Sequence, residues 1–328
     1  MQEDARPAAD SWLTFRDALT FIAWCSSAVF LGLFLFGLAA RHLLLAELIS
    51  SFNAQLAILM LICATFLLLL RQKMFGWLLL IVSVGQILIL VSVFLPSSQP
   101  QPGPQKIKVM SMNVWGDNDQ FQKVIDQIEV VSPDVLLVIE YNIQWHYKMM
   151  DLYSTYPHRM LEPRWHGYGI AMFSKLPLED TEVWQLTKKE TDVPALSARV
   201  KVGDQSLRIT GLHTMSPTNS LRMRLRTEQM NEVAVGLASI DEPSMLMGDF
   251  NCTPWSPFLQ DLTKACGYRD SRQGEGFLAS WNTELPWMFW IPIDHALVSE
   301  EVHVHERYTG EPCGSDHRPT IMEISVTR

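Results

Sequence analysis

The sequence predicts a mixed α/β sandwich that follows three transmembrane helices. The helices are predicted by three long apolar runs within the first 95 residues. The sandwich is predicted by strand-like and helix-like segments that alternate from residue 107 onwards. We therefore divide the 328 residues into a membrane anchor (1–95), a proline-rich linker (96–106) and a soluble domain (107–328).

The anchor is predicted from apolar runs at about residues 21–40, 52–70 and 75–95, which contain no Asp, Glu, Lys or Arg. A helix needs about 20 apolar residues to cross a bilayer, and a helix that is apolar all round must be buried in lipid or in a large core. A cleaved signal peptide is the alternative for the first run. It is disfavoured because a compact small-residue cleavage site is lacking and two more runs follow.

The orientation of the anchor follows from the charges that flank its predicted spans. The basic residues on one side are Arg6, Arg16, Arg71 and Lys73, and those on the other are Arg41, Lys106 and Lys108. The positive-inside rule assigns the larger set to the cytoplasm. We therefore expect a multi-pass protein of the cell inner membrane whose soluble domain is periplasmic or otherwise extracytoplasmic.

The soluble domain is acidic, with 21 Lys or Arg and 30 Asp or Glu residues from position 106 onwards, so it carries the whole net charge of −9. A protein that holds nucleic acid through phosphate contacts usually has a basic face, and this balance counts against a general nuclease. The five cysteines have neither metal-ligand spacing nor the pattern of a disulfide framework, so we expect no zinc site.

The strands and helices of the soluble domain are predicted from hydrophobic periodicity. The expected strands are 107–112, 135–140, 169–174, 196–202, 207–213, 244–248, 293–299 and 320–326, and the expected helices are 119–131, 221–240 and 255–266. Three arginines, Arg222, Arg224 and Arg226, open the second of these helices, and we expect them on a solvated face.

Polar residues cluster at the ends of the predicted strands. They are Asn113, Glu140, His213, Asp249, Asn251, Asp294, Asp316 and His317. Residues at corresponding strand ends of a sandwich can converge on one rim. Carboxylates, amides and histidines that converge there suit a hard, oxygen-preferring cation such as Mg²⁺, which polarises a phosphoryl group. Each signal alone has an ordinary structural explanation, and the ordered set is what favours a site.

That ordered set resembles the endonuclease/exonuclease/phosphatase superfamily, which has the deoxyribonuclease-I-like fold. The matching segments are 112–115 (MNVW), 138–140 (VIE), 167–174 (GYGIAMFS), 211–214 (GLHT), 248–251 (GDFN), 293–295 (IDH) and 314–319 (GSDHRP). They extend over essentially all of 107–328. The resemblance implies a four-layer α/β sandwich of two packed mixed β-sheets flanked by helices. The preceding anchor is typical of a bacterial membrane-anchored branch.

The resemblance also implies a role for each residue. Glu140 would be the main metal ligand, with Asn113 and Asp316 beside it and Mg²⁺ or Mn²⁺ as the metal. Asp249 and Asn251 would orient or deprotonate water and hold the phosphate, which His213 would contact. His317 would act as general base or transition-state donor, oriented by Asp294. Whether Asp249 or His317 takes the proton stays open.

These roles describe a metal-dependent hydrolase that cleaves a phosphodiester or phosphomonoester bond by in-line attack of water. The aromatic segment 280–292 precedes Asp294, and its Trp281, Trp287 and Trp290 are candidate substrate-binding residues that could contact a lipid head group or the membrane. Packing beneath the loop is the alternative for each. A nuclease acting on DNA or RNA and an inactive membrane scaffold are the alternative functions.

Overall fold

The computed structural model describes residues 9–188 and 190–327, which form two compact units whose boundary along the chain lies between Val93 and Phe94. The first unit consists of helices α1 (Ala9–Gly37), α2 (Leu44–Ser50), α3 (Asn53–Leu69) and α4 (Lys73–Ser92). Small and aliphatic side chains such as Ala23, Met60 and Leu79 fill its interior. Its outward faces are also apolar, which is the pattern of helices surrounded by lipid.

Among the described residues, two helical segments are long and apolar enough to cross a membrane: Phe15–Gly37 within α1, and α4. The third predicted span, 52–70, coincides with α3, which has 17 residues. Helix α3 is joined to α2 across a bend of 67°, and only this bent pair taken together makes a third candidate span. The structure thus gives two clear candidate spans, or three with the bent pair, where the sequence predicted three separate ones.

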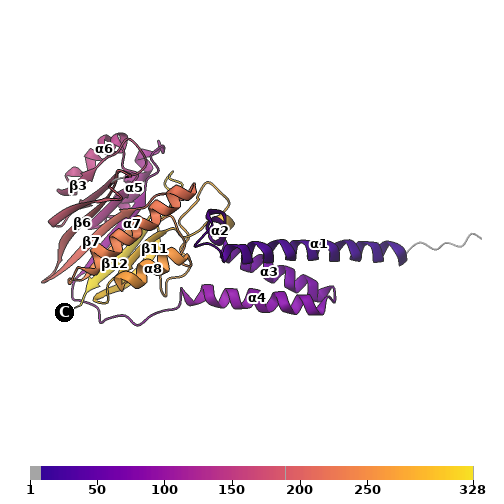
Figure 1. The fold of residues 1–328 in the computed structure, drawn as a ribbon. Coiled ribbons are helices and arrows are strands. Elements are labelled where there is room, and N and C mark those ends of the chain that lie inside the picture. The colour runs from indigo at the N-terminus through magenta and orange to yellow at the C-terminus, as the bar shows by residue number, and fades with distance from the viewer. Residues whose placement is uncertain (1–8, 189, 328) are drawn as a thin grey trace, which may run out of the picture. The chain divides into compact units, whose positions relative to one another are not determined.

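The second unit contains two six-stranded sheets packed face to face (Figure 1). The first sheet has the order β11 (Val302–Thr309), β12 (Thr320–Val326), β1 (Lys106–Asn113), β2 (Val135–Ile139), β4 (Ile170–Ser174) and β3 (His158–Glu162). The second has the order β5 (Glu179–Leu186), β6 (Val193–Val202), β7 (Gln205–His213), β8 (Ser244–Asp249), β10 (Asp294–Val298) and β9 (Arg269–Asp270). Both sheets are mixed, because β1 and β2 are parallel, β7 and β8 are parallel, and the other pairs are antiparallel.

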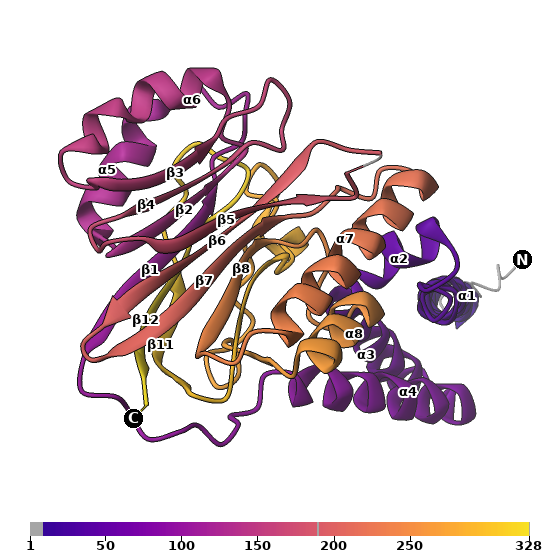
Figure 2. The same cartoon turned by 60° about the vertical axis from the view of Figure 1, so that its left-hand side comes forward.

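Helices cover the outer faces of the two sheets, as Figure 2 shows. Helices α5 (Phe121–Val131) and α6 (Ile143–Lys148), with the short helix η1 (Met149–Tyr153), lie on the first sheet. Helices α7 (Ser220–Ala238) and α8 (Pro257–Cys266) lie on the second, and η2 (Trp287–Phe289) is a single turn in a loop. The predicted sandwich of two mixed sheets flanked by helices is therefore confirmed.

Strand β1 shows why the sequence folds into these layers. Val109 lies in the core between the sheets, beside Leu137, Ile209 and Met247. Its neighbour Met110 points the other way, into the core beneath α5 and α6. Successive side chains of a strand point to opposite faces, so a strand that is covered on both sides is apolar over most of its covered length.

Candidate active site

Three adjacent strands of the second sheet place chemical groups side by side at one rim. His213 is the last residue of β7 and pairs in parallel register with Asp249, the last residue of β8. Strand β10 is antiparallel to β8 and begins with Asp294, which pairs with Asp249 from the other side. All three side chains are buried. Strand register therefore assembles three of the residues that the sequence singled out.

The first sheet brings the remaining groups to the same rim. Asn113 ends β1, and Glu140 directly follows β2, the parallel neighbour of β1. Because β12 is antiparallel to β1, the segment before β12, with Asp316 and His317, lies at this end too. The Oγ of Ser315 fixes that segment, because it donates to the carbonyl of Asn113 at 2.7 Å and accepts from the amide of His317 at 3.0 Å.

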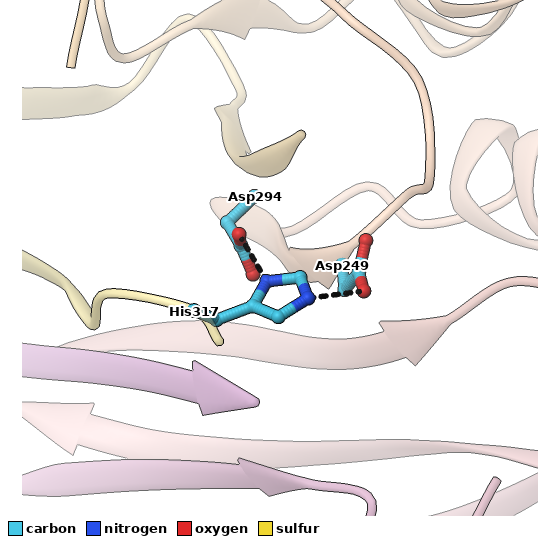
Figure 3. A group of neighbouring side chains, drawn as sticks. All are labelled: Asp249, Asp294 and His317. Carbon is cyan, nitrogen blue, oxygen red and sulfur yellow. Dashed lines mark hydrogen bonds and ion pairs between the residues drawn. The ribbon is translucent and has the colours of Figure 1, made fainter. Parts of the chain in front are cut away.

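The imidazole of His317 lies between two carboxylates, as Figure 3 shows. Its Nδ1 lies 2.8 Å from Oδ2 of Asp294, and its Nε2 lies 3.7 Å from Oδ2 of Asp249. Atoms of these three side chains that could bind a metal lie within 4.8 Å of one another. The short contact to Nδ1 is a charge-assisted hydrogen bond that sets the orientation of the ring.

The charges of this trio shift one another's pKa values. Burial opposes protonation of His317, but Asp294 and then Asp249 outweigh it and raise its pKa to about 10. Burial raises the pKa of Asp249 to about 7, although the charge of His317 works against this. Burial also acts to raise the pKa of Asp294, yet the charge and hydrogen bond of His317 hold it below its usual range. At neutral pH the geometry favours an imidazolium flanked by an ionised Asp294 and an Asp249 that can accept a proton.

Glu140 is held in a cradle of hydrogen-bond donors. Its backbone has a φ of +62°, a conformation that non-glycine residues rarely adopt and that often marks functional sites. Oε2 accepts from the amide of Gly116 at 2.9 Å, and Oε1 accepts from the amide group of Asn113 at 3.0 Å. Asn113 also donates to Asp249 at 3.2 Å, while its own oxygen accepts from the amide of Trp115. The side chain of Asn113 thus donates hydrogen bonds to the carboxylates of both Glu140 and Asp249.

The donor set around Glu140 fits a hard divalent cation. Burial raises the pKa of Glu140 in spite of its donors, so its anion would be stabilised by a positive charge. Within the described part of the chain, Oδ1 of Asp316 is buried without a hydrogen-bond partner. Its other oxygen, Oδ2, accepts from Trp281. Carboxylate oxygens of this kind are the ligands that hard cations prefer.

Asn251 and His213 both contact Asp249. Asn251 has a φ of +51°, and its amide group donates to the carbonyl of Thr214 at 3.0 Å. Its backbone N–H donates to Oδ1 of Asp249 at 2.8 Å, which fixes the turn after β8. Burial, followed by the charge of His317, lowers the pKa of His213 to about 3, so His213 is neutral at pH 7.

The three tryptophans of the aromatic segment have different surroundings. Trp281 is half-buried, and its indole N–H donates to Asp316 at 2.8 Å, so it orients a carboxylate of the site. The indole of Trp290 donates to the carbonyl of Leu285, and its ring lies under the guanidinium of Arg318. Trp287 is 76% exposed. Only Trp287 has the free surface expected of a residue that contacts an external partner.

The structure adds site residues to which sequence reasoning gave no role. Tyr168 lies in the matched segment 167–174, and its ring centroid is 5.0 Å from that of His213. The Oγ of Ser280 accepts from the amide of Asp294; Ser280 begins the aromatic segment 280–292, in which only the tryptophans were given a role. Arg226, expected on a solvated face, is fully buried and donates to the carbonyl of Asn251 at 2.6 Å.

Comparison with known proteins gives the family of the second unit. Residues 110–317 match the model of the endonuclease/exonuclease/phosphatase family. No curated protein matches the chain significantly.

Solved structures match the same unit at low sequence identity. TDP2 of D. rerio complexed with a single-strand DNA product is 17% identical with a TM-score of 0.59, covering 67% of this chain and 99% of that one. An endonuclease/exonuclease/phosphatase from Beutenbergia cavernae is 16% identical, with a TM-score of 0.55, and the match covers 68% of this chain and 72% of that one. A functionally unknown conserved protein from Enterococcus faecalis is 19% identical, with a TM-score of 0.56 and coverages of 67% and 100%.

The family match covers all six strands of the second sheet, most of the first sheet, and every residue of the rim from Asn113 to His317. The structural neighbours share the fold of this unit. The chain belongs to the endonuclease/exonuclease/phosphatase family, and it is a metal-dependent hydrolase acting on phosphoester bonds.

Proposed function

We propose that this protein is a membrane-anchored phosphodiesterase that uses Mg²⁺, with Mn²⁺ as an alternative metal. The observation that carries the proposal is the imidazole of His317, which lies between Asp249 and Asp294 and next to Asp316. Asn113 links Glu140 to the same group. Such a site can bind a phosphoryl group, activate water and stabilise the negative charge of an in-line displacement.

We assign the metal to Glu140 and Asp316, with Asn113 holding Glu140 in place. When bound there, the cation would polarise the phosphoryl oxygens and neutralise their charge. The family resemblance also makes Asn113 a ligand through its amide oxygen. In the present arrangement that oxygen accepts from Trp115, so ligation by Asn113 would need its amide to turn.

Asp249 is the residue that we assign as general base. Its pKa of about 7 suits a group that takes a proton from water near neutral pH. His317, with a pKa of about 10, keeps its proton and donates to the developing charge on phosphate. We assign neutral His213 and Asn251 to contact with the phosphate oxygens. This division is our proposal for the choice between Asp249 and His317 that the sequence left open.

A lipid phosphoester is the substrate class that we favour. Leu285, Trp287, Met288 and Phe289 are exposed large apolar side chains on one loop, and the same loop contains Trp281, which donates to Asp316. Tryptophan and phenylalanine side chains partition into the membrane interface. The acidic charge of the domain also disfavours a polyanion as substrate.

A nuclease is the second candidate, because the structural neighbour from D. rerio was crystallised with a single-strand DNA product. A nuclease predicts free basic side chains beside the rim. One basic side chain, Arg222, lies near the rim, with its Nη1 3.5 Å from the hydroxyl of Tyr168. Arg224 on the same helix is paired with Glu190, and the acidic balance of the domain still disfavours a polyanion. An inactive scaffold is the third alternative, and the intact hydrogen bonding of the site argues against it.

The test uses the full chain in lipid nanodiscs with Mg²⁺ or with EDTA. We expect hydrolysis of bis-p-nitrophenyl phosphate that EDTA and Glu140→Gln abolish, and we expect phospholipid to be cleaved in preference to single-stranded or duplex DNA. Trp287→Ser combined with Phe289→Ser should slow only the lipid reaction. Val130→Ser, an exposed apolar side chain on α5, is the matched control.

Three results would contradict parts of this proposal. Preference for DNA would make the protein a nuclease. Inactivity of the wild type toward every substrate and metal would make it a scaffold. A C-terminal fusion to a reporter that works only outside the cytoplasm tests the proposed periplasmic location in the inner membrane, and an inactive reporter would reverse the orientation.

A further inference from the structure

A buried ion cluster lies directly behind Asp294. Asp270, at the end of β9, accepts from the guanidinium of Arg272 at 2.9 Å and from that of Arg307 at 2.8 Å. The side chains of both arginines are almost completely buried. None of these three residues was expected from the sequence to have a role in the site.

Both arginines converge on one main-chain atom. Nη2 of Arg272 donates to the carbonyl oxygen of Asp294 at 2.9 Å, and Nη2 of Arg307 donates to the same oxygen at 3.1 Å. Asp294 is the residue whose carboxylate lies 2.8 Å from His317. Two charged donors therefore fix the backbone from which that carboxylate projects.

The two arginines come from different sheets. Arg272 follows β9 in the second sheet, next to β10, whereas Arg307 lies on β11 in the first sheet. The contact between Asp294 and His317 spans the same junction, since Asp294 begins β10 and His317 precedes β12. Arg307, on the first sheet, thus donates to the main-chain carbonyl of Asp294. His317, in the segment that leads into β12 of the same sheet, contacts the carboxylate of Asp294.

The cluster has more positive charge than its own partner can balance. Two guanidinium groups share the single carboxylate of Asp270, and the neighbouring anion is Asp294 itself. Among the described residues, the Nε of neither arginine has a hydrogen-bond partner. Buried ion pairs add little net stability over apolar packing, so stability alone does not account for this arrangement.

We propose that Arg272 and Arg307, held by Asp270, are positioning residues for the pair formed by Asp294 and His317. They fix the main chain of Asp294 across the two sheets, so that its carboxylate stays on Nδ1 of His317. Their positive charge also favours the ionised form of Asp294. The effect on turnover rests on the proposed hydrolysis, but the effect on the pair itself does not.

The test compares Arg307→Met with Arg208→Met in the full chain. Arg208 is a matched control because it is also buried, ion-paired to Glu242 at 2.6 Å and bonded to a main-chain carbonyl. It lies at the opposite end of β7 from His213. Arg307→Lys is the second variant, because one ammonium keeps the charge but cannot reproduce the two-pronged contact of a guanidinium.

Two measurements are made on each variant. The first is the downfield proton resonance of Nδ1 of His317, recorded in EDTA and assigned by its absence in His317→Asn. The second is kcat and KM for bis-p-nitrophenyl phosphate with Mg²⁺. We expect both Arg307 variants to shift or lose the resonance and to lose about ten- to a hundredfold in kcat, as slight misplacement of reacting groups does, with little change in KM. Arg208→Met should change neither.

The outcomes separate the two proposals. Loss of the resonance in the Arg307 variants supports positioning, even if the wild type proves inactive and the proposed hydrolysis fails. Retention of the resonance and of kcat in Arg307→Lys, at the level of Arg208→Met, would overturn the positioning role. If Arg307→Met does not fold, Arg307→Lys decides. A wild type without the resonance would overturn the proposal as well.

Discussion

Replacing Asp294 by asparagine tests how the site controls its protonation. The substitution keeps the size and the polar oxygen of the side chain but removes the negative charge from Nδ1 of His317, which lies 2.8 Å away. That charge is the main reason why the pKa of His317 rises to about 10 in spite of its burial. We therefore expect the pKa of His317 to fall.

The size of the fall follows from the geometry. Two unit charges whose centres lie about 4 Å apart interact with roughly 4 kcal/mol at an effective dielectric constant of about 20. One pKa unit corresponds to about 1.4 kcal/mol, so losing this interaction lowers the pKa of His317 by about three units, to about 7. In the variant, the imidazolium would be half lost at neutral pH.

The assay is an NMR titration of the protein labelled with ¹⁵N-histidine, in EDTA so that no metal charge intervenes. His317→Asn assigns the resonance. The profile of kcat against pH with Mg²⁺ is the functional companion, and we expect its alkaline limb to move to lower pH in Asp294→Asn. A His317 pKa within about one unit of the wild-type value would refute the electrostatic reasoning.

Three further predictions concern other parts of the site. Glu140→Gln, which keeps the shape of the side chain but removes its charge, should abolish Mg²⁺ binding in calorimetry while leaving the melting temperature near that of wild type; unchanged affinity would exclude Glu140 as a ligand. Gly248→Ala should destabilise the second unit by about 3 kcal/mol or more in urea, because a Cβ there would lie 1.8 Å from the carbonyl oxygen of Leu212 and φ is +144°; a loss below about 1 kcal/mol would contradict this. The pKa of His213 is about 3 in the folded protein against 6.5 for the unfolded chain, so the unfolded chain binds a proton first as the pH falls. The stability that is present above pH 6.5 should therefore decrease by up to about 1.4 kcal/mol per pH unit as the pH drops towards 3. His213→Gln should make this dependence of the melting temperature on pH less steep, and an unchanged dependence would show that His213 is not its source.

The strands that the sequence did not predict share one property. They are β3, β5, β9 and β11, which are the four edge strands of the two sheets. An edge strand has one neighbour and is partly solvated, so its residues need not form an apolar run. Strand β5 is mostly exposed and rich in acidic residues, which conceals it from a search for hydrophobic periodicity. Every predicted strand is matched, because the interior strands are covered on both faces.

Some residues of the candidate site could be predicted from the sequence, and others could not. Residues at strand ends, such as Asn113 and Asp249, could be found because each follows a clear apolar run and falls within a family motif. Residues that act through tertiary contact could not be found. Arg272 and Arg307 look like ordinary strand or loop arginines until the two sheets pack together.

Arg226 illustrates an error of a different kind. We expected Arg222, Arg224 and Arg226 to share one solvated face. Each helical residue turns the chain by about 100°, so Arg222 and Arg226 lie on nearly the same side and Arg224 lies on the other. Arg224 is exposed and paired with Glu190, whereas Arg226 is buried beneath the turn that contains Asn251. Helical geometry alone would have separated them.

The order of strands in the first sheet has a consequence for how the chain is made. Strand β1 lies between β2 and β12, and it provides Asn113, which lies 204 residues before His317. While the ribosome is still making the intervening chain, β1 has one unpaired edge, and the rim lacks His317. An unpaired edge is a template for association with other chains. Hydrolytic activity would therefore be acquired only once β12 has been made, after the apolar helices have already emerged, and the nascent domain would need protection until β12 closes the sheet.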